Sequence, residues 1–513
     1  MVFFESLLLL LFAAIVLLQV SRRFSLPYPA MLAAAGVVVA TIPGTPSIPI
    51  DPHLALALFI APALLDSAFD FPVATVRRFW VPLVALAVGS VAVTAALVAW
   101  AGWFFAGLPI AAALVLGAIV APPDAAAATA VLSTLPIPRS TDAILRGESL
   151  FNDAAALLLF SGALAVQTAG TLDAHVGLQL ILAAPGGLLF GILVAKLIGR
   201  FYHLIGDTLS GNLLQFVTTF LLWIVAERLH LSAVLCIVAF AMTVALDSKI
   251  GSSPRMRIHS YAVWSTVVFV LNVLAFLLMG MQARTIVADM NASRLQSALL
   301  FAALIVLLVV AARFAMVMTY NRLIVWRSRR RGLVTAPSLG QGVLASWCGM
   351  RGLVTLATAF ALPATFPQRE LVVLTAFAVV IGTLVFQGLT LAPLIRWLGL
   401  DRTTVGAEEM ATLREELARA GLDALEIRQE AAAEHLCREL QAKLDARSDP
   451  TVAAALEQRG ALGLAAIAAQ RKALDQMKTD NRLNADEFNL LLEELDWREL
   501  TLLPPARRRV EEQ

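Results

Sequence analysis

Long uninterrupted apolar runs constrain the fold of this chain more than any other feature. From the start to about residue 400 they recur, each roughly 17–25 residues long, which is enough for a helix to cross a bilayer. The chain is 59% hydrophobic and 15% charged, whereas soluble domains carry about 25% charged residues. The first run, FFESLLLLLFAAIVLL, lacks the basic segment and small-residue cleavage site of a signal peptide, which predicts a membrane span. We therefore expect an all-α polytopic membrane domain over residues 1–400.

The remainder of the chain, residues 401–513, is charged and has no such apolar run. Apolar residues at three- and four-residue spacing predict a tail of three helices, at 408–445, 460–477 and 484–502. Asn484 or Asp486 is the expected cap of the last helix. Two roles are open for this tail: a solvated helical appendage, or a module for regulation or dimer support.

Composition excludes several classes of partner and cofactor. The net charge of +2 gives no general attraction to nucleic acid. Cys236, Cys348 and Cys437 lie far apart and form no CxxC pair, so no disulfide framework or cysteine metal site is expected. Neither a G-x-G-x-x-G fingerprint nor a Walker motif is present. We expect no cofactor and no nucleic-acid partner.

The apolar runs predict about 13 membrane spans. Their approximate limits are 3–20, 27–44, 52–69, 79–104, 107–134, 147–168, 174–199, 210–228, 231–247, 259–282, 295–320, 338–362 and 369–398. Arginine and lysine concentrate in every second connection, from Arg22 and Arg23 after the first span to the RSRRR cluster after the eleventh. The positive-inside rule places these connections in the cytoplasm. The N-terminus is then outside and the tail inside, which requires an odd number of spans.

Two of the predicted spans are interrupted near their middle. The fifth contains Pro122–Asp124, where proline removes a backbone donor and clashes with the preceding turn. The twelfth contains Gly349–Gly352, with paired glycines around an arginine that is costly in hydrocarbon. The breaks fall in the fifth span of spans 1–6 and the fifth of spans 8–13. That placement is typical of two inverted repeats whose discontinuous helices cross at a central site.

The sixth span opens with four polar side chains in the segment RGESLFNDAAALLLF. Glu148 and Asn152 share a helix face, whereas Asp153 is rotated by about 100° and lies over Ser149. A buried carboxylate needs a partner or a proton. One carboxylate that binds either a proton or a cation, but not both, is the minimum machinery of an antiporter. A structural ion pair is the alternative role, favoured for Glu148 with Arg351 as its partner.

The segment GESLFND resembles the GESLLND signature of the monovalent cation:proton antiporters, in their electroneutral Asn-Asp branch. Further segments that resemble this family follow in order: ALFIAPALLDSAFD, GAIVAPPDAAAATAVL, IVAERLHLSAVLCIV, VFVLNVLAFLLMGM, CGMRGLVTLATAFALP and LVFQGLTLAPLIRWLGL. The resemblance covers essentially the whole membrane part. It implies a 13-span fold of two inverted repeats, a core domain that moves against a dimerisation domain, and a homodimer.

The resemblance also assigns roles to single residues. The family's ion-binding aspartate and adjacent asparagine fall on Asp153 and Asn152, which would hold Na⁺. Its glutamate and crossing-region arginine, thought to pair, fall on Glu148 and Arg351, and its crossing-span acid falls on Asp124. Such an acid offsets the dipoles of half-helix ends.

This chain departs from the family pattern at one position of the fifth span. Where the family commonly reads Thr-Asp-Pro, the chain reads Pro123-Asp124-Ala125, so the threonine hydroxyl is absent. Ser149, Asn152 and freed backbone carbonyls are the candidates to replace it, because Na⁺ prefers hard oxygen ligands. The choice among Na⁺, K⁺ and Li⁺ is correspondingly open.

Together these observations predict Na⁺/H⁺ exchange by alternating access in a bacterial inner membrane, with protons, monovalent cations and the bilayer as partners. A cation channel or membrane receptor with a sensing tail is the alternative. The chain is not expected to be an enzyme, since GESL lacks the flanking glycine of a nucleophile elbow and no H-E-x-x-H is present. Arg313, inside the eleventh span, is expected to form a structural pair in the core.

Overall fold

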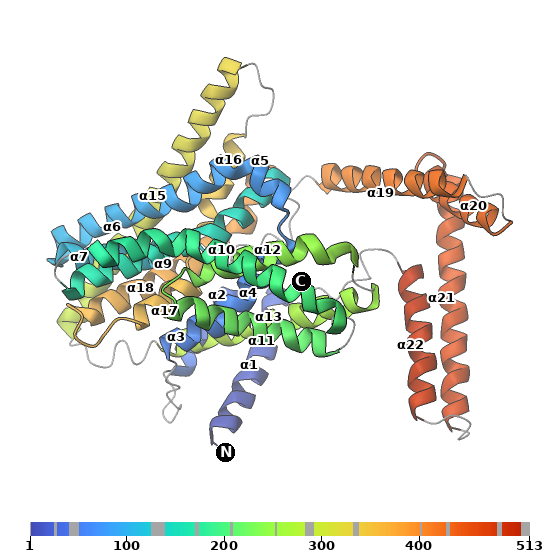
Figure 1. Ribbon diagram of the computed structural model, residues 1–513, viewed down its shortest axis with the longest axis horizontal. Coiled ribbons are helices and arrows are strands. Elements are labelled where there is room, and N and C mark those ends of the chain that lie inside the picture. The colour runs from blue at the N-terminus through green and yellow to red at the C-terminus, as the bar shows by residue number, and fades with distance from the viewer. Residues whose placement is uncertain are drawn as a thin grey trace. The chain divides into compact units, whose positions relative to one another are not determined.

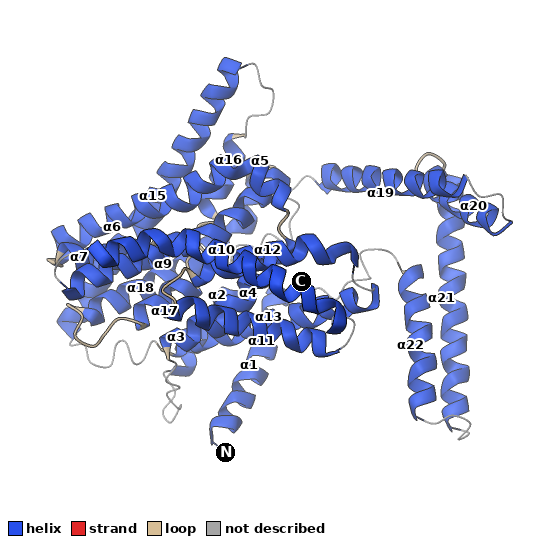
Figure 2. Cartoon of the chain, in the orientation of Figure 1, coloured by secondary structure: helices blue, strands red, loops and turns tan. Residues whose placement is uncertain are grey.

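The computed structural model describes residues 2–24, 28–40, 51–124, 139–169, 174–205, 209–251, 254–282, 292–331, 338–400, 403–426, 431–479 and 485–503. The regular structure in these ranges is helical throughout, as Figure 2 shows. The chain divides into two compact units, Met1–Asp401 and Arg402–Gln513.

The first unit is a bundle of helices that carry the predicted spans (Figure 1). Its elements are α1 (Val2–Phe24), α2 (Tyr28–Ala40), α3 (Pro52–Ala55), η1 (Leu56–Ile60), α4 (Ala61–Asp70), α5 (Val73–Val84), η2 (Ala85–Gly89), α6 (Ser90–Ala106), α7 (Ile110–Val120), α9 (Arg139–Ala169), α10 (Ala174–Ile205), α11 (Leu209–Arg228), α12 (Ala233–Gly251), α13 (Pro254–Met281), α15 (Ala292–Arg331), α16 (Leu339–Trp347), α17 (Leu353–Phe360) and α18 (Arg369–Trp397). The η elements are π-helical turns continuous with their neighbours.

Length and apolarity make this first unit a multi-pass membrane domain. Among the described residues, 7 helical segments are long and apolar enough to cross a membrane. Large apolar side chains such as Ile181 and Leu189 on α10 are exposed, 72% and 68% respectively, as a lipid-facing helix requires.

One of the membrane-length segments, Pro450–Leu474, lies in the tail. The prediction that no such run follows Asp401 is therefore wrong by this criterion. The most apolar 18-residue stretch of this segment has a mean hydropathy of 1.2, whereas the corresponding stretches of the other segments reach 1.6 to 2.7. The apolar residues of this segment are mostly alanines and leucines, and charged residues such as Glu457, Arg459 and Arg471 interrupt them. The segment therefore has the length of a membrane helix but is only weakly apolar.

Small residues allow some helices of the bundle to touch backbone to backbone. A Cβ on Gly36 of α2 would lie 2.3 Å from the Leu277 carbonyl oxygen of α13. A Cβ on Gly280 of α13 would lie 2.1 Å from the Ala33 carbonyl oxygen of α2. Close packing of this kind is the main attraction between helices in lipid, where burial of apolar surface gives little.

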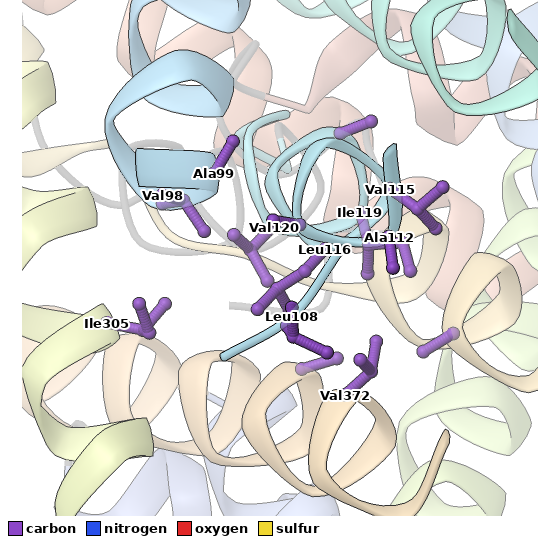
Figure 3. Packing of buried hydrophobic residues seen from close by; sticks show 14 of the residues in the cluster. Val98, Ala99, Leu108, Ala112, Val115, Leu116, Ile119, Val120, Ile305 and Val372 are labelled. Atoms are coloured by element: carbon purple, nitrogen blue, oxygen red, sulfur yellow. The ribbon is translucent and has the colours of Figure 1, made fainter. Parts of the chain in front are cut away.

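The short helix α7 lies at the centre of an extensive apolar cluster (Figure 3). Its Leu116 and Val120 are fully buried. Figure 3 shows the neighbours that surround it: Val98 and Ala99 of α6, Ile305 of α15 and Val372 of α18. A helix that is apolar all round belongs in a protein interior. This packing holds the C-terminal end of α7 deep inside the domain.

Both predicted breaks appear in the backbone. Helix α7 ends at Val120, and residues 121–124 are not helical. The twelfth predicted span is two helices, α16 and α17, joined by the non-helical segment Cys348–Gly352. The prediction of a broken twelfth span is thus confirmed. The second half of the fifth span falls outside the described residues, and the count of 13 spans and the inverted repeats stay predictions.

The second unit contains four described helices rather than the three predicted. They are α19 (Thr403–Glu426), α20 (Ala431–Asp445), α21 (Pro450–Thr479) and α22 (Ala485–Leu502). The single helix predicted at 408–445 is wrong because the chain doubles back there. Glu415 of α19 pairs with Arg447 beyond the end of α20, and Gly421 approaches Leu440. The folded-back arrangement lets the apolar stripes of both helices face one another. Asn484, one proposed cap of the last helix, lies outside the described residues.

Candidate ion-binding site

The two broken helices meet at Asp124. Its backbone N–H donates to the Met350 carbonyl at 2.7 Å, and its Oδ2 accepts from the Leu353 N–H at 3.2 Å. Leu353 is the first residue of α17, so the Asp124 carboxylate caps the N-terminus of that helix. A negative charge is favourable there, because the first N–H groups of a helix have no partner within it.

Arg351 makes the reverse connection, from the break between α16 and α17 to the end of α7. Its Nε donates to the Val120 carbonyl at 3.1 Å and its Nη2 to the Ala121 carbonyl at 3.3 Å. Its Nη1 donates to the Gly349 carbonyl. A cation is favourable at a helix C-terminus, where carbonyls lack partners. Each broken helix therefore receives its charged cap from the other.

We call the contact between residues 120–124 and residues 348–352 the crossing. Gly352 makes this contact sterically possible. A Cβ at that position would lie 1.6 Å from Asp124 Oδ2. No side chain fits in that space, so the close approach of the two breaks requires glycine. This gives a physical reason for the second glycine of the pair.

Helix α9 packs on the crossing through Asn152. The Asn152 Nδ2 donates to the Pro123 carbonyl at 2.8 Å, and the side chain is fully buried. A carbonyl only accepts, so this bond determines the orientation of the amide. The amide oxygen Oδ1 is then left buried without a hydrogen-bond partner in the described part of the chain.

Asp153 follows Asn152 on α9 and is 8% exposed. Within the described ranges no cationic side chain pairs with it, and the charged group that acts on it is the carboxylate of Asp124, which has the same sign. Two neighbouring carboxylates repel unless a cation or a proton lies between them. Ser149, one turn earlier on the same helix, is half-buried.

Glu148 pairs with Arg313 of α15. Arg313 Nη1 lies 2.5 Å from Glu148 Oε1, and Nη2 lies 3.0 Å from Oε2. Arg313 Nη2 also donates to the Ala345 carbonyl at 3.2 Å. Bidentate contacts of this kind are the strong form of ion pair.

The predicted pair between Glu148 and Arg351 is therefore wrong. Both carboxylate oxygens of Glu148 accept hydrogen bonds from Arg313, while the guanidinium of Arg351 donates to backbone carbonyls at the crossing. Gly349 leaves the space that Arg313 occupies, since a Cβ there would lie 2.1 Å from Arg313 Cδ. The prediction that Arg313 forms a structural pair in the core is confirmed.

Residues 8–397 match the family model described as sodium/hydrogen exchanger, transmembrane. The chain belongs to the sodium/hydrogen exchanger family. This family consists of transporters rather than enzymes, and the channel and receptor alternatives receive no support from it.

Several relatives of this exchanger chain come from bacteria. A sodium, potassium, lithium and rubidium/H⁺ antiporter of Bacillus pumilus is 30% identical over 405 residues, which is 75% of this chain and 60% of that relative. An uncharacterised Na⁺/H⁺ exchanger of Mycobacterium bovis is 28% identical, over 96% of this chain and 95% of its own length. The chain thus spans less than two thirds of the Bacillus relative and nearly all of the mycobacterial one.

A solved structure shares the fold of this exchanger chain. The sodium proton antiporter MjNhaP1 from Methanocaldococcus jannaschii superposes with a TM-score of 0.60 at 17% identity, covering 76% of this chain and 100% of that one. At this identity the likeness concerns the fold alone. The family is shown by the match to the family model, and the solved structure adds the likeness in fold.

The exchanger chain also has a small apolar cavity beside α17. Its volume is about 250 Å³. It is lined by Ala55, Phe59, Ala275, Leu278, Met279, Gln282, Leu353, Leu356, Ala357, Phe360 and Arg369. The walls therefore come from α3, η1 and the end of α13 on one side, and from α17 and the start of α18 on the other.

Sequence reasoning missed two threonines of this site. Thr383 of α18 accepts a hydrogen bond from the Arg351 backbone N–H at 3.0 Å, which ties the break to a continuous helix. Thr355 lies in the first turn of α17 and is 1% exposed. Threonines are common in apolar helices, so only their position next to a broken helix could have singled them out.

Proposed function

We propose that this protein is a secondary transporter that exchanges cytoplasmic Na⁺ for external H⁺ by alternating access, with Li⁺ and K⁺ as further candidate cations. Cation and proton compete for Asp153. One observation carries the proposal: a buried carboxylate without a cationic partner in the described residues lies next to the buried, unpartnered Oδ1 of Asn152. That pair of groups suits a small cation, which takes hard oxygen ligands.

Each site residue has a distinct role in this proposal. Asp153 supplies the charge that binds the cation or the proton, and Asn152 and Ser149 supply neutral oxygens. Asp124 holds the end of α17 in place and adds negative charge near the cation. Glu148 and Arg351 do not bind the cation, since one pairs with Arg313 and the other caps α7.

The names of the relatives support exchange as the activity. The Bacillus pumilus relative is named for sodium, potassium, lithium and rubidium, and the Mycobacterium bovis relative for sodium. Both names include the proton as the second ion. Na⁺ and H⁺ are the cargo in the proposal, and no resident cofactor enters it.

The cellular setting is part of the same proposal. Basic residues in alternate connections favour an N-terminus outside and a cytoplasmic tail, in the inner membrane of a bacterium. A homodimer follows from the resemblance to the antiporter family. The bilayer is the expected environment of the membrane unit, and nucleic acid is not an expected partner.

Proteoliposomes test the proposal directly. Purified protein is reconstituted with an internal pH dye, and Na⁺, K⁺, Li⁺ or Rb⁺ is added outside, with and without a membrane potential. We expect a Na⁺ gradient to drive proton movement in the parent protein. A channel would pass the cation down its gradient without coupled proton movement, and that result would overturn the proposal.

A further inference from the structure

The hydroxyl of Thr355 has no hydrogen-bond partner among the described residues, although the side chain is 1% exposed. A buried hydroxyl without a partner loses its bonds to water and gains nothing in exchange. Such groups are rare in native proteins, and each one calls for an explanation.

Other threonines of the described membrane helices show what is usual. Their hydroxyls donate to the carbonyl four residues earlier: Thr168, Thr219, Thr243, Thr266, Thr358, Thr375, Thr383 and Thr390. Thr94 of α6 is an exception, since its buried hydroxyl also has no partner among the described residues. Thr355 is the third residue of α17, so the residue four positions earlier, Arg351, lies outside the helix. The break thus removes the usual partner and leaves the hydroxyl available.

The same face of α17 points toward the end of α7. Ala359, one turn after Thr355, belongs to the apolar cluster that contains Ile119 and Val120 of α7. Residues four apart lie on one helix face, and α17 packs against both α7 and α9, which favours a position of Thr355 toward the segment that continues from Val120 to Asp124. In the same turn, the Leu353 N–H donates to Asp124.

Two buried oxygens that have no partner among the described residues therefore belong to helices that meet at the crossing, Asn152 Oδ1 to α9 and Thr355 Oγ1 to α17. We propose that Thr355 is a further oxygen ligand of the transported cation, opposite Asn152. This inference rests on the proposed function and deepens it. It also accounts for the missing hydroxyl at Pro123, because a hydroxyl reaches the site from the other broken helix.

Matched variants isolate the hydroxyl from the shape of the side chain. Thr355→Val keeps the branched shape and removes the oxygen, while Thr355→Ser keeps the oxygen. Thr358→Val is the control, since Thr358 is equally buried on α17 but donates to the Val354 carbonyl at 2.7 Å. Reconstituted protein is assayed for the KM of Na⁺ and of K⁺. Detergent-purified protein is assayed for the rise in melting temperature that Na⁺ causes.

We expect Thr355→Val to raise the KM for Na⁺ by about tenfold, the effect of losing one favourable polar contact. The ratio of KM values for Na⁺ and K⁺ should change, and the Na⁺-dependent rise in melting temperature should shrink. Thr355→Ser should resemble the parent. The inference is overturned if Thr355→Val keeps the parent's KM and thermal response, or if Thr358→Val matches its losses. A parent protein without exchange activity would instead overturn the proposed function, and the thermal response to Na⁺ would still test Thr355.

Discussion

Arg313 and Glu148 face one another through two contacts, at 2.5 and 3.0 Å, with both side chains 2% exposed. They join α15 to α9 beside the break between α16 and α17. Their burial determines what a substitution should do. Removing one partner leaves an uncompensated buried charge, which costs about 3–5 kcal/mol.

We therefore expect Glu148→Gln and Arg313→Met each to lower the melting temperature of the purified protein. The double variant should recover much of the loss, since neither charge is then left alone. Thermal unfolding in detergent measures all three. If the single variants were as stable as the parent, or the double variant less stable than both, the pair would not stabilise the fold.

Gly352 tests the contact between the two breaks. Gly352→Ala places a Cβ 1.6 Å from Asp124 Oδ2, so the crossing must open and transport should be lost. Gly340→Ala, in the first helix of the same broken span, meets no atom closer than 3.8 Å and serves as the control. Proton flux in proteoliposomes distinguishes them. Parent-like flux from Gly352→Ala would show that the close approach is dispensable.

Asp153→Asn tests the titrating group. The amide keeps the size of the side chain but binds no proton, so exchange should disappear while the protein stays folded. In the parent, the KM for Na⁺ should increase as pH falls, because protons occupy the same carboxylate. Cation-driven proton flux near the parent rate in Asp153→Asn would remove this residue from the mechanism.

Asp449 gives the tail a pH dependence. Its Oδ1 accepts from the Thr451 hydroxyl at 2.6 Å and the Thr451 N–H at 2.8 Å, at the start of α21. These bonds hold the pKa of the carboxyl below its usual value of 3.8. A carboxyl with a lowered pKa in the folded state stabilises that state above pH 3.8, and the contribution is lost as pH falls through the folded-state value.

Hydrogen exchange on the full-length protein measures this effect. Amides in the first turn of α21 should lose protection on acidification below pH 3.8. Asp449→Asn is the control, because asparagine caps a helix as well as aspartate but does not titrate. An equal loss of protection in Asp449→Asn would assign the pH dependence to another group.

Protease accessibility of the tail tests the orientation of the chain in the membrane. The basic connections predict a cytoplasmic tail, so protease added to right-side-out vesicles should leave it intact. Inverted vesicles provide the control in which cleavage occurs. Cleavage from the outside would reverse the predicted topology and require an even number of spans for an external N-terminus.

The sequence predicted the features that depend on local chemistry. Apolar runs located the membrane helices, and Gly349–Gly352 located the break in the twelfth span, because both follow from hydropathy and backbone preference. The segment around Asp153 identified the candidate site, because polar side chains in a membrane span cost free energy and usually have a functional role.

The arginine that pairs with Glu148 could not be predicted in the same way. Two arginines, Arg313 and Arg351, both lie in apolar spans, and either could have met Glu148. Which one does depends on the rotation of α15 and on where the two breaks cross, and neither is encoded in local spacing. The importance of Thr355 is hidden for the same reason, because its lost partner is a consequence of where α17 begins.

The exchange of caps between α7 and α17 also has a mechanical consequence. Separating the two breaks would strip Asp124 from one helix end and Arg351 from the other at the same moment, inside a water-poor interior. In the proposed exchange cycle we therefore expect the two breaks to move as a single rigid piece, together with a cation held beside them. Movement of this piece relative to the other helices is then expected at contacts that contain few hydrogen bonds. The small cavity between α17 and the η1–α13 wall lies at a candidate for such a contact, since most of the side chains that line it are apolar.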